Sequence, residues 1–326
     1  MNHLVTTALK HTFKNDKKNI LLGIWCKIYN KKYDENFETN NEHHWNNRDK
    51  LNDDYDEIEK TYEKILKNLQ ENLNKYHGTK FSLKYWRIFI GPWLSNFLHS
   101  TFDKWENIRI LKKKYIINST SVINIKNFDI IPNTLEEYNR LMSTDIWNHY
   151  IYSKVIKYHY ENSIVYEDIE IDYKWKKNPL AGSFNTNLSE IKGIKKSKFL
   201  ILVYKIINKI YYYLKKNDDV FIYKTYLGKN LEKNIRVNFN QISSHFLYLE
   251  EKKNLVEKLN IKILRLDFEC KNQFENFIKD IIIDLIPLIY IENFKYFKSS
   301  LLDLPFPKNP KLILSSHILN NSQTSL

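Results

Sequence analysis

The feature that most constrains this fold is a stripe of apolar residues, spaced three and four apart, over residues 48–77. This spacing predicts a long amphipathic helix. Gly78 predicts the end of that helix, because glycine readily adopts the left-handed conformation that closes helices. The stripe consists of Leu51, Tyr55, Ile58, Tyr62, Ile65, Leu69, Leu73 and Tyr76. It needs an apolar partner, either a coiled-coil helix of another chain or, more commonly, an antiparallel neighbour, here residues 80–105.

Strand-like apolar runs alternate with helical patterns, which predicts an α/β fold with a Rossmann-like, mostly parallel sheet and long helices. We expect one sheet to contain residues 3–7, 20–26, 220–226, 262–268 and 311–316, with a further strand at 121–131. Helices are expected at residues 48–77, 80–105, 146–160, 195–215, 230–258 and 273–299, and another starts near 132–137. Residues 164–175 alternate weakly, and Pro179, Gly182 and Gly193 predict a loop over 176–195.

The formal net charge of +13 over 326 residues would ordinarily favour nucleic acid or an anionic membrane as a partner. However, the lysines are spread along the chain beside acids, and glycine falls to 6 residues while lysine, asparagine, isoleucine and tyrosine are enriched together. Codon bias produces such a pattern. We therefore expect no specific nucleic-acid partner, and at most peripheral membrane contact through residues 193–216.

Cysteine usage and the first residues favour a cytoplasmic protein. Cys26 and Cys270 lie far apart and have no Cys-x-x-Cys partner, so neither a zinc site nor a disulfide framework is expected. The chain opens without the charged, apolar and small-residue segments of a signal peptide.

The positions of the glycines exclude several enzyme classes. Glycine occurs only at positions 23, 78, 91, 182, 193 and 228, so there is no Gly-x-Gly-x-x-Gly and no Walker loop. The chain also lacks Gly-x-Ser-x-Gly and His-Glu-x-x-His. Nucleotide binding by glycine-rich phosphate loops, serine-hydrolase chemistry and zinc-protease chemistry are therefore not expected, and no cofactor is indicated.

A tryptophan-rich segment from Tyr85 to Trp93 sets a helix break beside an arginine. Pro92 cannot continue a regular helix, so Gly91 as N-cap and Pro92 as the first helical residue would expose backbone N–H groups to an anion. Arg87 could add a guanidinium to that anion site. The alternative is a proline-kinked core helix with Arg87 on a structural carboxylate.

Residues His43 to Arg48 place two imidazoles, an indole and a guanidinium before the long helix, a mixture that suits a polar pocket. Adjacent histidines point in different directions in most backbones, so a metal pair is not expected. The alternative is a plain loop with solvent-facing histidines.

Asp145, Asn148 and His149 fall within one helical turn, where side chains at i, i+3 and i+4 meet. They could form an acid–base or hydrogen-bonding cluster. Alternatively, Asp145 complements the helix dipole and His149 is an ordinary residue at the edge of the core.

Taken together, these motifs resemble a family of transferases from bacterial gene clusters for surface polysaccharides: O-antigen, capsule and flagellar glycan. The matching residues are Leu4 to Leu9, Gly23 to Cys26, His44-Trp45 with Arg48, Asn74 with His77-Gly78, Tyr85 to Leu94, Asp103 with Trp105, Trp147-Asn148-His149, and Leu304-Pro305 through Ser316. The resemblance implies a glycosyltransferase-like protein with two Rossmann-like domains facing a cleft.

The chain departs from that family in several places. Family members are longer, and their C-terminal half carries a Gln-His-Gly-Gly type segment of the donor site that is absent here. Ile24, Asn46 and Asn47 stand where acids are common, and Lys104 where arginine is usual. We therefore expect the N-terminal half of a glycosyltransferase-B-like architecture, with an acceptor-side α/β domain at 1–304. Residues 305–326 would be a linker and the first strand of a truncated second domain.

The resemblance implies a transferase of surface-polysaccharide biosynthesis whose partners are a sugar nucleotide, a glycan acceptor and a separately encoded C-terminal half. We expect His44 and His149 as catalytic residues, substrate contacts from Thr7, Arg48, Arg87, Gly91, Trp93, Asp145 and Asn148, and no metal. The cations would stabilise charge that develops on the leaving group. The alternative is a non-catalytic fragment or a basic module that binds an anionic glycan or nucleic acid, with an affinity that falls steeply with salt.

Overall fold

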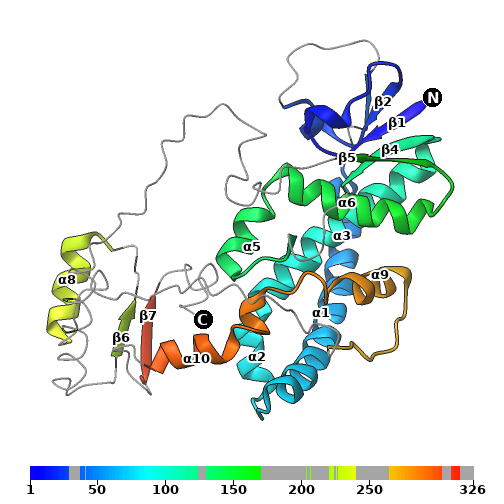
Figure 1. The fold of residues 1–326 in the computed structure, drawn as a ribbon. Helices are drawn as coiled ribbons and strands as arrows, with labels where there is room; N and C mark the ends of the chain where they lie inside the picture. Colours follow the sequence, from blue (N-terminus) through cyan, green and yellow to red (C-terminus); the bar gives the residue numbers. More distant parts are fainter. Residues whose placement is uncertain are drawn as a thin grey trace. The chain divides into compact units, whose positions relative to one another are not determined.

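The chain forms two compact units, drawn in Figure 1. The computed structural model describes residues 1–28, 37–40, 42–123, 130–169, 203, 206, 220–223, 225, 227–239, 264–302 and 310–315. Unit 1 combines residues 1–185 with 260–291, and unit 2 combines 186–259 with 292–326. Each unit is therefore assembled from two stretches of chain, and the predicted domain boundary at residues 304–305 stays a prediction.

Unit 1 contains a five-stranded sheet of order β3-β2-β1-β4-β5, and every pair of neighbouring strands in it is parallel. The strands are β1 (Asn2–Val5), β2 (Lys18–Leu21), β3 (Phe37–Thr39), β4 (Ser119–Ile123) and β5 (Val165–Ile169). In register, Leu4 lies opposite Ile20 on one side and Thr120 on the other. The central strands bury their apolar side chains, so an α/β fold with a parallel sheet is confirmed.

Two strand predictions need correction. The strand expected over 20–26 ends at Leu21, and a 3₁₀ helix, η2 (Ile24–Lys27), follows Gly23. Residues 264–268 form no strand, because this segment bonds to side chains of a helix instead of to a sheet. Asn68 Oδ1 accepts from the backbone N–H of Asp267 at 3.1 Å, and Asn68 Nδ2 donates to its carbonyl oxygen at 2.8 Å.

The helical core of unit 1 is an antiparallel hairpin. Its first arm, α1 (Arg48–His77), has the predicted bounds, and Gly78 closes it with a φ of 64°. The second arm is α2 (Leu83–Phe89) followed by α3 (Gly91–Lys114). Tyr62 of α1 meets Gly91 at the start of α3, whereas Lys50, earlier in α1, pairs with Glu106, later in α3. The two arms therefore run in opposite directions, as the antiparallel alternative predicted.

The side-chain amide of Asn74 stabilises the turn between the two arms of the hairpin. Asn74 Oδ1 accepts from the Thr79 hydroxyl at 2.8 Å, from the Phe81 N–H at 3.0 Å and from Trp86 Nε1 at 3.1 Å. His77 Nε2 lies 2.9 Å from the carbonyl oxygen of Tyr290. These motif residues therefore have a structural role.

The break at Pro92 is a bend within continuous hydrogen bonding. The N–H of Ile90 donates to the carbonyl oxygen of Trp86 at 2.8 Å, and the N–H of Leu94 donates to that of Ile90 at 3.0 Å. Ile90, in the right-handed helical conformation, is the N-cap of α3, so the prediction of Gly91 as N-cap is wrong by one residue. Because the first-turn bonding continues from α2, the junction is not an isolated helix start.

The remaining helices of unit 1 cover the hairpin and the sheet. Thr134 and Thr144 cap α5 (Leu135–Leu141) and α6 (Asp145–Tyr160), and each hydroxyl accepts a backbone N–H three residues on. The helix predicted over 273–299 is interrupted: α9 (Gln273–Ile281) ends before Pro287, and η6 (Leu288–Tyr290) follows it. Proline has no N–H and disfavours a helical residue before it.

Unit 2 holds a separate sheet of two parallel strands, β6 (Val220–Tyr223) and β7 (Leu312–Ser315). The prediction that these residues share one sheet with the N-terminal strands is therefore wrong, because each strand hydrogen-bonds to the other within this unit. Its helices are α8 (Lys229–Asn238) and α10 (Phe294–Leu302). Apart from residues 203 and 206, the helix predicted over 195–215 lies outside the described residues, as does most of 230–258 beyond α8.

A search of the described residues for membrane spans found no helix with the length and apolar character to cross a bilayer.

We expect Gly91→Ala to lower the free energy of unfolding by about 1–3 kcal/mol, because a methyl group at this position would clash with the Tyr62 hydroxyl. A Cβ at this position would lie 2.5 Å from the Tyr62 hydroxyl oxygen and 3.7 Å from the next Tyr62 atom. In a Tyr62→Phe background the same substitution should cost much less. Urea denaturation of the four proteins in this double-mutant cycle measures the difference. An equal cost in both backgrounds would contradict the packing described.

Candidate functional site

The first polar cluster lies where β1 ends. In a parallel sheet of this order the chain runs outward from β1 to β3 and then returns to β4 on the other side of β1. Ligands of open α/β sheets bind at the carboxyl ends of the strands beside such a switch point. Thr6 and Thr7 follow β1 directly, so their side chains stand at the position where a ligand is expected.

Two contacts join this loop to the start of α6. Thr6 Oγ1 lies 2.7 Å from His149 Nδ1, and the backbone N–H of Ala8 interacts with the Asp145 carboxylate. On the other side, Trp25 Nε1 donates to the Thr6 carbonyl oxygen at 2.9 Å. The structure thus brings Thr6, Asp145 and His149 together, as the spacing on α6 allowed but did not require.

Burial decides the charge of His149. Its side chain is buried, and desolvation lowers its pKa to about 3, assisted by the charges of His11 and His3 and opposed by the Ser121 backbone carbonyl. The imidazole is therefore neutral at pH 7 and holds Thr6 through a hydrogen bond. So low a pKa makes His149 a weak proton acceptor.

The polar groups around Thr6 differ in whether they have a hydrogen-bond partner. Thr7 is buried at 1 % exposure, and its hydroxyl has no hydrogen-bond partner among the described residues. Burial raises the pKa of Asp145, although the Ala8 N–H opposes that shift. Asn148 is half-buried on the same turn of α6. A buried hydroxyl without a partner costs stability, and Thr7 shares this state with several other buried polar atoms of the described chain; what distinguishes it is its place directly after β1.

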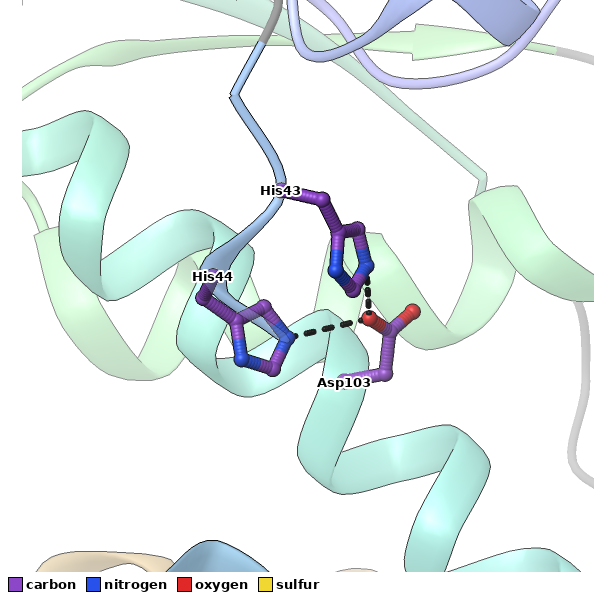
Figure 2. Close-up of side chains that lie close together, drawn as sticks. All are labelled: His43, His44 and Asp103. Carbon is purple, nitrogen blue, oxygen red and sulfur yellow. Dashed lines mark hydrogen bonds and ion pairs between the residues drawn. The ribbon is translucent and has the colours of Figure 1, made fainter. Parts of the chain in front are cut away.

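The second cluster joins the segment after β3 to α3, and Figure 2 shows it. His43 Nε2 lies 2.8 Å and His44 Nε2 3.1 Å from the same oxygen, Asp103 Oδ1, which also accepts from Asn107 Nδ2 at 3.1 Å. The two imidazoles are stacked, with centroids 4.5 Å apart. The expectation that adjacent histidines diverge is therefore wrong here. His43 is extended whereas His44 begins the 3₁₀ helix η3 (His44–Asn46), and this turn brings both rings to one side.

The position of protons favours hydrogen bonding over metal binding in this cluster. His43 Nδ1 accepts from the backbone N–H of Trp45 at 3.2 Å, so its proton lies on Nε2, which donates to Asp103. A metal ligand would need the lone pair of that nitrogen.

A second set of groups, His44, Asp54 and Glu106, has the spacing of metal ligands. The side-chain ammonium group of Lys50, however, lies among them. Lys50 Nζ is 2.7 Å from both carboxylate oxygens of Asp54 and 3.0 Å from Glu106. Arg109 forms a bidentate pair with Glu106 at 2.6 and 2.7 Å. The acids are therefore balanced by cations of this chain.

His44 lies between these two sets. Its side chain is fully buried, with Nδ1 3.6 Å from Asp54 and Nε2 bonded to Asp103. Burial raises the pKa of Asp103, but the His44 hydrogen bond and the charges of Lys104, His43 and His44 outweigh it, so the pKa lies below its usual value. His44 thus holds an ionised Asp103 in place, and a direct catalytic role for His44 or His149 stays a prediction.

Four predicted contact residues lie outside both clusters. Arg48 is exposed in the first turn of α1, and Trp93 is fully buried, stacked on Phe97. Gly91 packs under Tyr62. Arg87 forms a bidentate ion pair with Glu63 of α1. Pairing with a carboxylate of the chain was the alternative to an anion site. Ligand roles for these four residues stay predictions.

Comparison with known proteins identifies the family of this chain. A family model described as LIC12162 family transferase matches residues 2–325. The chain belongs to the LIC12162 family of transferases. No curated protein and no solved structure matches it.

For this LIC12162 family member, sequence reasoning missed three residues at the second cluster: Lys50, Asp54 and Glu106. Spacing offered a signal, since Lys50 and Asp54 are four apart on α1, and Asp103 is followed by Glu106 and Asn107 on one face of α3. What spacing could not show is that these two faces meet.

The two adjacent threonines provide a matched test. We expect Thr6→Val to lower the free energy of unfolding by about 1–3 kcal/mol, because it leaves buried His149 Nδ1 unpaired. Thr7→Val removes a hydroxyl that has no partner among the described residues, so stability should stay within about 0.5 kcal/mol or rise. Chemical denaturation compares them. A larger loss for Thr7→Val than for Thr6→Val would contradict this assignment.

Burial of neutral histidines should make stability depend on pH. The folded pKa of His149 is about 3 against an ordinary 6.5, so its contribution is complete above 6.5 and is lost as the pH falls toward 3. His159, whose pKa burial lowers to about 4, acts in the same direction. Each group contributes a slope of about 1.4 kcal/mol per pH unit. His149→Asn should therefore give a shallower decline between roughly pH 6 and pH 5 in urea titrations. Identical slopes would contradict a neutral, buried His149.

Proposed function

We propose that this transferase acts in bacterial surface-polysaccharide biosynthesis and moves a sugar from a sugar nucleotide to a glycan acceptor. The observation that carries the proposal is the position of Thr7: within a family of transferases, a buried hydroxyl without a described partner stands where β1 ends. That edge of a parallel sheet is where α/β proteins bind their ligands.

The proposed roles follow from the contacts. The Thr7 hydroxyl would hydrogen-bond the substrate, and Asp145 and Asn148 would flank it from the first turns of α6. His149 is a positioning residue, because it bonds to Thr6 and fixes the loop that carries Thr7. The substrate would thus meet a loop that is already ordered, which lowers the cost of binding.

The rival function is a basic module that holds nucleic acid or an anionic glycan. Its support is the net charge of +13. Several of the lysines, however, are engaged with acids of the same chain: Lys14 and Lys17 both pair with Glu167, and Lys64 pairs with Glu275. These pairs account for individual lysines, but the net charge of +13 already subtracts every acid, so the salt dependence of nucleic-acid binding has to separate the two functions.

A transfer assay tests the proposal. The gene is deleted in the bacterium that encodes it, and membranes of the deletion strain supply the glycan acceptor. Purified protein is then incubated with these membranes and a panel of radiolabelled UDP-, GDP-, CMP- and dTDP-sugars. With cytosol of the deletion strain added as the source of the separately encoded C-terminal half, we expect wild-type protein to restore incorporation of one labelled sugar, since the missing step is the one in which this protein takes part.

Thr7→Val should reduce that incorporation about 2- to 12-fold, the effect of losing one hydrogen bond of 0.5–1.5 kcal/mol. Lys60→Gln, an exposed change on α1, is the control and should leave incorporation unchanged. Absence of incorporation from every donor, together with nucleic-acid binding that weakens steeply with salt, would favour the rival.

A further inference from the structure

A pocket of about 360 Å³ opens between the two arms of the hairpin in unit 1. Ligand pockets of proteins range over roughly 300–1,000 Å³, so this one suits a small group such as a single sugar ring. None of its lining residues belongs to the proposed substrate edge at the end of β1. It is lined by Trp45 of η3, Leu51, Tyr55 and Ile58 of α1, and His99, Ser100 and Asp103 of α3.

Aromatic rings form much of the wall. Trp45 is fixed, because its Nε1 donates to Asp54 Oδ2 at 3.0 Å and its ring lies against His44 with centroids 4.5 Å apart. Tyr55 and His99, from opposite helices, have ring centroids 5.9 Å apart, and Tyr55 is 53 % exposed. The faces of aromatic rings carry partial negative charge, so they attract the C–H groups on the apolar face of a sugar.

Asp103 supplies the polar contact, and it is the one acid in the lining. Its Oδ1 accepts from His43, His44 and Asn107, as given above, whereas no described residue donates to Oδ2. Figure 2 shows this second oxygen turned away from both imidazoles. Oδ2 is not among the buried polar atoms that lack a partner, so a donor from outside the chain can reach it: water in the free protein, or the hydroxyl of a ligand in its place. An anionic ligand would be repelled.

We propose that this pocket binds a neutral sugar residue, with its apolar face on Tyr55 and Trp45 and a hydroxyl donating to Asp103 Oδ2. Assigning that sugar to the glycan acceptor rests on the proposed function. The sugar nucleotide carries phosphate charge and is excluded from this pocket by Asp103, so the pocket separates the two substrates. His43 and His44 are positioning residues, because they hold Asp103 Oδ1 and leave Oδ2 to the ligand.

Saturation-transfer NMR tests the pocket without any transfer reaction. The probes are methyl glycosides of neutral hexoses and of N-acetylhexosamines, with UDP and inorganic phosphate as competitors. We expect one or more of the glycosides to bind wild-type protein, and neither UDP nor phosphate to displace it. Displacement by UDP would place a nucleotide in the pocket and overturn the proposal.

Three variants locate the binding. Tyr55→Leu removes an exposed ring without disturbing the core and should weaken glycoside binding about 2- to 12-fold, the scale of one aromatic contact. Asp103→Asn should weaken it at least about tenfold, as expected for a charge-assisted hydrogen bond. Asp56→Asn removes an exposed carboxylate from the same helix, outside the pocket, and is the matched control.

The outcomes separate this proposal from the proposed function. If Tyr55→Leu and Asp103→Asn bind the glycoside as wild type does, the pocket assignment is wrong even where transfer activity is present. If both weaken binding while no sugar nucleotide supports transfer, the pocket is a carbohydrate site and the proposed transfer reaction is wrong. Because Asp103→Asn also disturbs η3, circular dichroism confirms its fold, and Tyr55→Leu decides the result where that variant is unfolded.

Discussion

The close antiparallel packing of α1 against α3 is the constraint on which the rest of unit 1 depends. At one end Gly91 lets Tyr62 approach the backbone of α3, and at the other Lys50 joins Asp54 to Glu106. Between these points the helices present Tyr55 and Asp103 to the pocket. Hydrogen bonds from His43 and His44 to Asp103 hold the segment after β3 against the hairpin. The pocket therefore exists only where the helices and this segment meet.

The two clusters of unit 1 differ in electrostatics, and that difference underlies the proposed mechanism. At the end of β1 the described polar groups are a neutral imidazole, an unpaired hydroxyl and a carboxyl whose pKa burial raises. At the hairpin an ionised carboxylate faces an aromatic wall. The ionised Asp103 disfavours an anionic ligand at the hairpin, because like charges repel, whereas the described groups at the end of β1 are mostly uncharged.

Local patterns in the sequence predicted part of the local structure, although the strands expected at 20–26 and 121–131 overlap β2 and β4 only at one end. The stripe from Leu51 to Tyr76 predicted the bounds of α1, and the positions of β1, β2 and β4 followed from apolar runs. The short polar strand β3 offered no such run and was missed. Residues 264–268 carry a strand-like pattern, yet side chains of α1 satisfy the backbone of this segment. Tertiary contacts of this kind override local propensity.

The candidate sites were harder to predict than the fold. The grouping of Asp145 with His149 followed from helical spacing, and the structure adds Thr6 as the partner. The convergence of His43 and His44 on Asp103 could not be predicted, since it joins residues about sixty positions apart in the chain. Arg87 and Trp93 stood out by residue type; the structure places Arg87 in an ion pair with Glu63 and Trp93 in the core, and their ligand roles stay predictions. Residue type alone does not separate a ligand contact from a structural one.

Hydrogen–deuterium exchange measured by mass spectrometry tests the central claim, that unit 1 has two separate ligand sites of opposite preference. With a neutral glycan added, we expect protection in the peptides that contain residues 43–55 and 99–103, which line the pocket. With a sugar nucleotide, protection should fall on residues 6–9 and 145–149 at the end of β1. Protection of the same peptides by both ligands, or of neither set by either ligand, would contradict the account.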